Sequence, residues 1–224
     1  MKQVMFTLAV LLNAYMLSAC SINIGADRSA GHYERDAAGY GANDGVIERS
    51  LSVRPFTALE CRLPASVTYV QTNDQAPKVV LKGAPAMVER CVVDVRDGKL
   101  QLYLVQKAKQ SMKRFSQSRN QLNITVYGGR LTALAVQSAC SFYAERLEMP
   151  QLALSNAGAS TIRVWRFAGQ QLTMSCSGAS STKLAGNVAK LMLNVTGASS
   201  FVANEFTTQD LKVKVSGAST AKCA

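Results

Sequence analysis

Four carboxylates in the C-terminal half of the chain are the residues best suited to acid–base chemistry. Enzymes that cleave glycosidic bonds use two carboxyl groups placed across one site, and calcium ions bind clusters of carboxylate and carbonyl oxygens. The acids between Leu131 and Ala224 are Glu145, Glu148, Glu205 and Asp210. Measured from the nearest copy of a repeat described below, they lie at offsets of +6, +9, +8 and −7 residues. Because they share no offset, we expect no carboxylate pair or ladder.

A serine nucleophile would need a histidine base, and the chain has a single histidine, His32. His32 lies in a segment rich in glycine, alanine, serine and aspartate, where we expect it to be solvated and not a metal ligand. We therefore predict that the protein is not an enzyme and has no metal and no cofactor. A carbohydrate-active β-helix enzyme is kept as the alternative.

The N-terminus carries a thiol in a setting suited to lipid attachment. Met1-Lys2 begins a largely apolar run that ends at Leu17-Ser18-Ala19-Cys20. This ending resembles a bacterial lipobox, in which small residues admit a signal peptidase and the cysteine forms a thioether with lipid. The resemblance implies cleavage before Cys20 and lipidation of that residue. The apolar run is shorter than a membrane-spanning helix requires and is typical of a secretory signal.

The predicted domain order follows from this N-terminus. Residues 1–19 are the lipoprotein signal peptide, residues 20–45 form a flexible tether, and residues 46–224 form one β domain. Ser21, which follows the cysteine in place of aspartate, favours export to the outer membrane of a two-membrane bacterium. We expect a lipid-anchored protein of the bacterial cell envelope whose membrane contact is the N-terminal lipid.

Five further cysteines remain, and their number is odd. Export would allow disulfides, and Cys61 and Cys91 are the best candidate pair. Without any Cys-x-x-Cys pair a zinc site is not expected. Burial as small apolar residues is the alternative for most of the five.

The densest positive charge lies in residues 106–120, which contain no acid. We interpret this segment either as a solvated loop or as a patch that binds anionic lipid, lipopolysaccharide or an acidic glycan, or docks an unknown protein partner. Nucleic acid is not an expected partner, since the chain is exported and shows no aromatic stacking platform. The basic residues of this segment are Lys107, Lys109, Lys113, Arg114 and Arg119.

The elements that position these residues are organised by an internal repeat. Tetrads of the type Ser-Gly-Ala-Ser recur with a period near 20 residues, and we place a degenerate first copy at residues 138–141. Glycine accepts a positive φ and close backbone approach, and small residues can stack at a corner. We interpret the tetrads as corners of a coil and their serines as structural. The repeated corner residues are Gly158, Gly178, Gly197, Gly217, Ser160, Ser180, Ser199 and Ser219.

An alternating apolar pair precedes each tetrad, as a strand with one buried face requires. Aligned on the second tetrad residue, the pairs are Ala133 and Ala135, Leu152 and Leu154, Leu172 and Met174, Leu191 and Leu193, and Leu211 and Val213. Phe167, Val188 and Phe206 are expected to supply a third buried face. The pattern predicts an all-β protein, a right-handed parallel β-helix-like solenoid with coils of about 20 residues.

The N-terminal half predicts less regular strands that cap this solenoid. We place them at residues 53–56, 66–71, 78–83, 92–95, 99–105 and 122–127, with a turn at Asp97-Gly98, and no helix. The composition agrees: of 224 residues 48% are hydrophobic and 17% charged, which excludes a disordered chain and a helical bundle with charged outer faces. The net charge of +11 suggests an anionic neighbour.

These features in this order resemble the head GIN domain family, the putative auto-transporter adhesins. The resemblance rests on the strand at 66–71, the Asp97-Gly98 turn, the strand at 99–105 and the tetrad array, and it covers about residues 46–224. It implies an exported β-helix-like domain that is often lipid-anchored. We expect a non-catalytic role in adhesion, binding or envelope structure, with a partner-binding subunit that uses the basic segment as a further alternative.

Overall fold

The computed structural model describes residues 45–73, 76–105 and 122–223. All of them belong to one compact unit, Tyr40–Ala224. Their backbone forms one fourteen-stranded sheet and one short helix, so the predicted all-β class is confirmed. The elements before the repeats are β1 (Ile47–Ser52), β2 (Ala58–Arg62), β3 (Ser66–Gln71), β4 (Lys78–Gly83), α1 (Pro85–Arg90), β5 (Cys91–Arg96), β6 (Lys99–Leu104) and β7 (Asn123–Gly128). The repeats contain β8 (Ala133–Gln137), β9 (Ser141–Glu148), β10 (Gln151–Asn156), β11 (Thr161–Cys176), β12 (Ser181–Val195), β13 (Ser200–Val215) and β14 (Thr220–Cys223).

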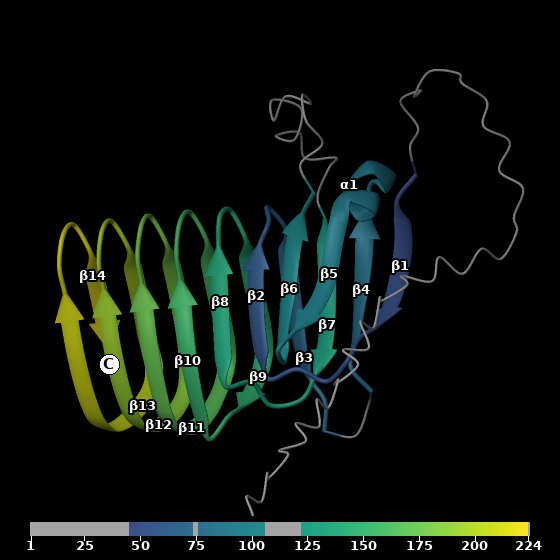
Figure 1. Ribbon diagram of the computed structural model, residues 1–224. Coiled ribbons are helices and arrows are strands. Elements are labelled where there is room, and N and C mark those ends of the chain that lie inside the picture. The colour runs from purple at the N-terminus through teal and green to yellow at the C-terminus, as the bar shows by residue number, and fades with distance from the viewer. Residues whose placement is uncertain (1–44, 74–75, 106–121, 224) are drawn as a thin grey trace, which may run out of the picture. The chain divides into compact units, whose positions relative to one another are not determined.

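The sheet curls into a right-handed solenoid with two opposed faces (Figure 1). The first face contains β5, β6, β2, β8, β10 and the C-terminal halves of β11, β12 and β13. The second face contains β1, β4, β7, β3, β9, β14 and the N-terminal halves of the same three long strands. A tetrad connects the first face to the second in each repeat, and the long strands bend to return to the first face.

The coils at the N-terminal end of the stack do not follow chain order. The coil of β2 and β3 lies between that of β6 and β7 and that of β8 and β9, all in parallel register. Three antiparallel strands then close this end: β5 on the first face, and β4 and β1 on the second. β1 and β5 are therefore the two edge strands at this end of the sheet.

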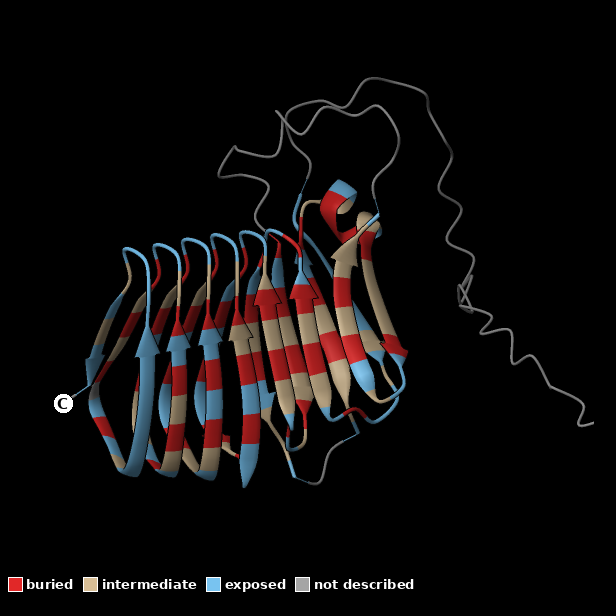
Figure 2. Cartoon of the chain, turned by 60° about the vertical axis from the view of Figure 1, so that its left-hand side comes forward, coloured by how far each residue is buried: buried red, intermediate tan, exposed pale blue. Residues whose placement is uncertain are grey.

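The core consists of side chains that repeat at the same register in successive coils (Figure 2). Leu154, Met174 and Leu193 align in one row, and Leu152, Leu172 and Leu191 in another, as the apolar pairs predicted. Phe167, Val188 and Phe206 are also buried, as expected, but they do not form one register row. Phe167 and Phe206 both align with Gly186, whereas Val188 aligns with Gly169 and Thr208. At the C-terminal end β14 pairs with the first residues of β13, but no described strand covers the C-terminal half of β13, where Leu211, Val213 and Val215 are each more than 40% exposed.

The predicted first tetrad is wrong by one residue. Leu134 of β8, and not Ala133 or Ala135, aligns with Leu154. The residue that stacks on Gly158 is Ser138, whose φ of 68° matches the 75° to 79° of the four tetrad glycines. Cys140 therefore takes the buried position that serine occupies in later coils.

Ser138→Gly is expected to stabilise the protein by roughly 1 kcal/mol, because a non-glycine residue in the left-handed region carries a cost of about that size. The Ser138 side chain is exposed, and its hydroxyl forms no hydrogen bond with another described residue, so its removal costs no such bond. Thermal unfolding measures the change. The matched control is Ala139→Gly in the same corner, which should destabilise slightly, and an equal effect of both changes would contradict the assigned register.

Two further expectations need correction. Residues 85–90 form the helix α1, which begins at Pro85, a residue favoured in the first turn, whereas no helix was expected. Residues 53–56 are not a strand, and β1 and β2 flank them instead. The strands predicted at 66–71 and 78–83 coincide with β3 and β4.

Candidate functional site

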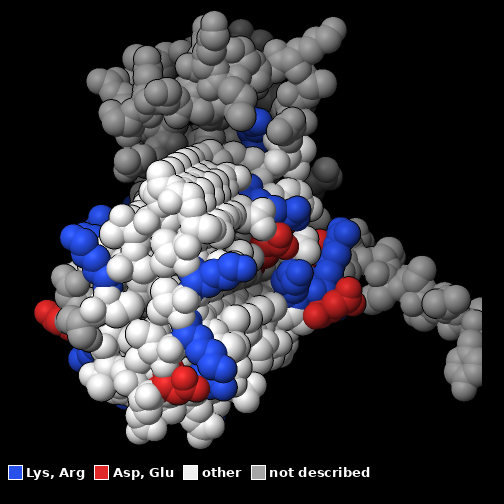
Figure 3. All heavy atoms as spheres, turned by 90° about the vertical axis from the view of Figure 1, so that its left-hand side faces the viewer, with Lys and Arg blue, Asp and Glu red and all other residues white. Residues whose placement is uncertain are grey.

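The tetrad serines have structural surroundings in the folded chain. Ser160, Ser180 and Ser199 are buried. The Ser199 hydroxyl donates to the Gly178 carbonyl of the preceding coil at 3.3 Å, and Ser219 donates to Gly197 at 3.0 Å. A buried hydroxyl held by a main-chain carbonyl is inaccessible to a substrate. The corners form an uncharged ridge, and the charged side chains visible in this view lie on its flanks (Figure 3).

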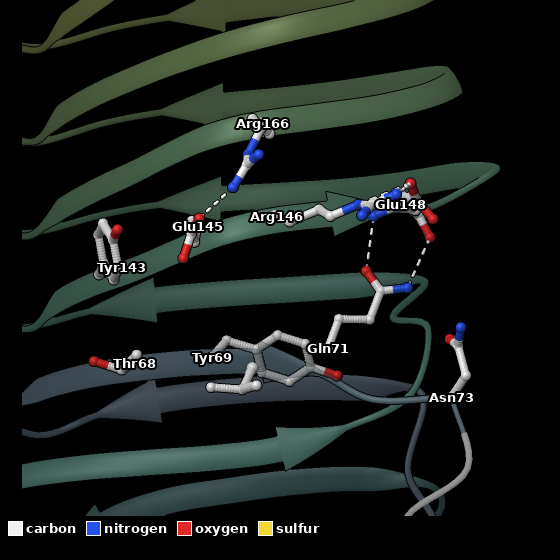
Figure 4. Close-up of a pocket in the computed structure, with 10 residues that line it drawn as sticks. Thr68, Tyr69, Gln71, Asn73, Tyr143, Glu145, Arg146, Glu148 and Arg166 are labelled. Atoms are coloured by element: carbon white, nitrogen blue, oxygen red, sulfur yellow. Dashed lines mark hydrogen bonds and ion pairs between the residues drawn. The ribbon is translucent and has the colours of Figure 1, made fainter.

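A groove of about 410 Å³ lies on the outer side of the second face. Its side chains come from the adjacent strands β3, β9 and β11 (Figure 4). Gln71 joins two of these strands: its amide nitrogen donates to the Glu148 carbonyl at 3.1 Å, and its amide oxygen accepts from the Glu148 N–H at 2.7 Å. The groove wall is therefore pre-formed.

Both carboxylates in this groove are held by arginine. Arg146 bonds Glu148, with its Nε 2.9 Å from a carboxylate oxygen, and Arg166 bonds Glu145 from the neighbouring coil. Tyr143 lies beside them and is about one-third exposed. An arrangement of exposed ion pairs next to an aromatic ring is suited to recognising a polar ligand through hydrogen bonds and ring contact.

A second hollow of about 190 Å³ adjoins the groove on β11, β12 and β13. Trp165, next to Arg166, is 58% exposed and forms one wall. Arg163, Lys183 and Glu205 contribute its charged groups, and neither cation has an ion-pair partner among the described residues. We refer to the groove and this hollow together as the second-face surface.

The chain matches a family model over residues 55–224, which is most of its length. The family is described as putative auto-transporter adhesin, head GIN domain. The chain belongs to this family. No curated protein matches it.

Solved structures with the same fold support the head GIN assignment of the domain's architecture. A putative adhesin from Bacteroides fragilis superposes with a TM-score of 0.73 at 18% identity, covering 83% of each chain. A putative lipid binding protein and a putative adhesin, both from Parabacteroides distasonis, give TM-scores of 0.55 and 0.56 at 15% and 13% identity, each covering 77% of this chain and 79% of the other. At these identities the similarity establishes the fold.

The head GIN domain holds Cys61 and Cys91 as free thiols, so the predicted disulfide is absent from this structure. β6 lies between β2 and β5, which carry these residues. Two strand spacings separate their backbones by about 10 Å, beyond the Cα separation that a disulfide tolerates. The thiol of Cys61 instead forms a hydrogen bond with Cys140, and this contact and burial raise its pKa.

Alkylation of the native protein at pH 8 should modify Cys223, slowly, and spare the buried cysteines. The thiolate is the nucleophile, and burial raises the pKa of Cys91 to about 12, so its thiol stays protonated and shielded. Cys223 is exposed, although partial burial raises its pKa too. Mass spectrometry after denaturation without reductant should find all five described cysteines labelled; two unreactive ones would show that Cys61 and Cys91 are joined after all.

Two groups of predicted site residues lie outside the described residues. These are the lipobox, Leu17 to Cys20, and the basic segment with Lys107, Lys109, Lys113, Arg114 and Arg119. His32 also lies outside them. Lipidation and anionic-surface binding by these residues remain predictions.

The described residues contain no group of three or more histidine, cysteine and acidic side chains that could hold a metal ion. No described helix has the length and hydropathy of a membrane span. The repeat pattern identifies Glu145, Glu148 and Glu205 as candidates but not Trp165 or the arginines of the second-face surface. A signal was present: Val164 and Phe167 are separated by two exposed residues where strict alternation would allow one.

Proposed function

We propose that the chain is an exported, lipid-anchored cell-envelope protein whose head GIN domain is a non-catalytic, adhesin-like binding module. The single observation that carries the binding role is the second-face surface, where aromatic and charged side chains are exposed on a rigid sheet. Sites built on regular elements hold their side chains more firmly than sites on loops. The names of the similar structures, two putative adhesins and a putative lipid binding protein, agree with a binding role.

The carboxylates of the groove argue against the enzyme alternative. Glycosidic cleavage needs one protonated acid and one free carboxylate facing the same bond. Glu145 and Glu148 instead each form an ion pair with an arginine, so neither carboxylate is free to act at a glycosidic bond. Glu205 lies on β13, three coils from β9.

Lipid anchoring rests on Cys20 and on the length of the segment after it. Residues 20–45 comprise 26 positions, which span at most about 90 Å when fully extended. A lipidated Cys20 would thus keep the domain at the membrane while leaving its faces accessible. More than one acyl chain is needed for stable anchoring, and lipoprotein modification provides this.

Metabolic labelling of bacteria with a fatty-acid analogue tests the anchoring. The full chain should be labelled, Cys20→Ala should not, and Cys223→Ala should be labelled like the wild type as the matched control. Label retained by Cys20→Ala would overturn the anchoring. Cells that produce the wild type should also adhere to polysaccharide-coated surfaces more strongly than cells that produce Cys20→Ala, and equal adhesion would contradict an anchored adhesin.

A further inference from the structure

We propose that the hollow around Ala185 on the second face binds one anionic sugar ring of an acidic polysaccharide. This inference rests on the proposed binding function and names its ligand class. The ligand is a sugar that carries a carboxylate or a sulfate group. The proposal depends on the strand register, on two unpaired cations, on one exposed tryptophan and on the space between them.

The register arranges the lining side chains as two short rows across three strands. Arg163, Lys183 and Val202 align in one row on β11, β12 and β13. In the next row Ala185 aligns with Glu205, and a bulge between Val164 and Phe167 brings Trp165 to its other side. Neighbouring strands are about 4.8 Å apart, so the two rows enclose an area comparable to one sugar ring.

The two cations are unfavourably placed without a ligand. Arg163 and Lys183 are exposed, in register on adjacent strands. Like charges directly opposite each other destabilise a sheet, and neither has an ion-pair partner among the described residues. An anion bound between them would relieve the repulsion, and the guanidinium fork of arginine suits a planar carboxylate.

Trp165 supplies the surface for the sugar ring. Its indole is 58% exposed, although tryptophan is among the residues that gain most from burial. The C–H groups on one side of a pyranose ring are apolar and can pack against an aromatic face. The ring of Trp165 and the cations Arg163 and Lys183 line the same hollow, so one ligand can contact all three.

Ala185 and Glu205 define the remaining space. Ala185 lies between the larger side chains, and its small side chain makes the depression. Glu205 has no ion-pair partner among the residues described and can accept hydrogen bonds from sugar hydroxyls. With two cations and one acid the hollow has a net charge of +1, which favours an anionic over a neutral sugar.

The adjoining groove points to a polymer as the ligand. Arg166 faces the groove and Trp165 the hollow, so β11 contributes consecutive residues to both. The row that contains Arg163 and Lys183 extends in one direction to Tyr143 on β9. In the other direction it extends through Val202 to Lys222 on β14. A polysaccharide that lies across the strands would meet aromatic and cationic groups in successive coils. A membrane surface fits less well: among the described residues, Val70 and Tyr143 are the other large exposed apolar side chains of this surface, and both line the groove together with its ion pairs.

Binding of the full chain, purified in detergent, to defined polysaccharides tests this proposal. The probes are polygalacturonate, its neutral methyl ester and dextran sulfate, with phosphatidylglycerol vesicles as the membrane arm. Arg163→Gln with Lys183→Gln should weaken polyanion binding about tenfold or more, because charge-assisted hydrogen bonds are lost. Trp165→Ala should weaken it about fivefold or more, and Ala185→Leu, which fills the hollow, should do the same.

The matched control separates this site from the overall positive charge. Lys212→Gln with Lys214→Gln also removes two positive charges, but from the first face. This double variant should change the affinity for polyanions less than about twofold, since distant exposed charges are screened. Equal effects of the two double variants would overturn the proposal. So would undiminished binding of the methyl ester, preference for the vesicles, or no saturable binding of either polyanion. Stronger binding of polygalacturonate or of dextran sulfate identifies the anion.

The fatty-acid labelling of Cys20 is independent of these measurements. Loss of polyanion binding with labelling and cell adhesion intact would remove the sugar site and leave the proposed anchored adhesin. If the full chain is not labelled but still binds polyanions, the proposed lipid anchoring is removed and the sugar site is retained.

Discussion

Gly186→Ala is expected to destabilise the protein by about 3 kcal/mol or more, from backbone strain and steric overlap together. Gly186 has a φ of 128°, a conformation that residues with a side chain rarely adopt. A Cβ at this position would lie 2.1 Å from the Phe167 carbonyl oxygen and 2.5 Å from its backbone nitrogen. Because both atoms belong to the main chain of the preceding coil, a side-chain rotation cannot remove the overlap.

Three glycines of this chain allow the two causes to be separated by thermal unfolding. Gly169 has no positive φ, but its Cβ would lie 2.3 Å from the Met149 carbonyl oxygen, so Gly169→Ala tests the overlap alone. Nothing lies within 4 Å of a Cβ at Gly45, so Gly45→Ala should be neutral. The unfolding midpoint should fall by roughly 6–12 °C for Gly186→Ala, less for Gly169→Ala, and not at all for Gly45→Ala. An unfolding midpoint for Gly186→Ala equal to that of Gly45→Ala would contradict the positive φ of Gly186 and its close approach to the Phe167 backbone.

The repeats could be predicted from the sequence because each signal in them is local. An apolar pair such as Leu172 and Met174 specifies which side of a strand is buried, and the glycine that follows, Gly178, specifies the corner. The first copy was misaligned because Ser138 stands where glycine was sought. Leu134 and Val136, which are buried, fit the apolar pattern better than Ala133 and Ala135. Choosing Leu134 and Val136 as the apolar pair gives the correct alignment of the first copy.

The order of the N-terminal coils could not be predicted in this way. β2 pairs with β8 across more than 70 residues of chain, and β6 and β7 are inserted beside them. No local pattern encodes such pairing, since each strand shows only which of its sides is buried. The predicted disulfide failed for the same reason: Cys61 and Cys91 are near in sequence, yet β6 lies between their strands.

The candidate site follows from a break in the pattern rather than from the pattern itself. In β9 and β11 two consecutive exposed residues separate buried ones, Glu145 and Arg146 in the first and Trp165 and Arg166 in the second. The doubled exposed positions direct larger side chains outward in adjacent coils. Function is thus placed where the repeat departs from strict alternation, as expected if the regular positions serve only packing.

Phe142→Ala should be among the most destabilising substitutions in the core, with a loss of about 3–5 kcal/mol, as found for buried phenylalanines elsewhere. Phe142 lies on β9, between Val67 of β3 and Ile162 of β11 in the same register row. Its ring stacks on Tyr69 with centroids 6.4 Å apart, and Tyr69 in turn donates a hydrogen bond to the Gly129 carbonyl. Phe142 therefore connects the coil of β2 and β3, which lies early in the chain, to the repeats that follow.

Because Phe142 lies at one interface of the stack, the loss of stability in Phe142→Ala should be unevenly distributed among the coils as well as large. Stability in a solenoid is close to a sum of coil and interface terms, so a cavity at β9 should weaken β3 and β7 more than the distant β12 and β13. Urea unfolding gives the total loss, and amide exchange gives its distribution along the stack. Phe142→Leu, which retains most of the volume, should lose less than about 1.5 kcal/mol. Uniform loss of protection in all coils would mean that the domain unfolds as one unit, and Phe142 would then support the whole solenoid and not one interface.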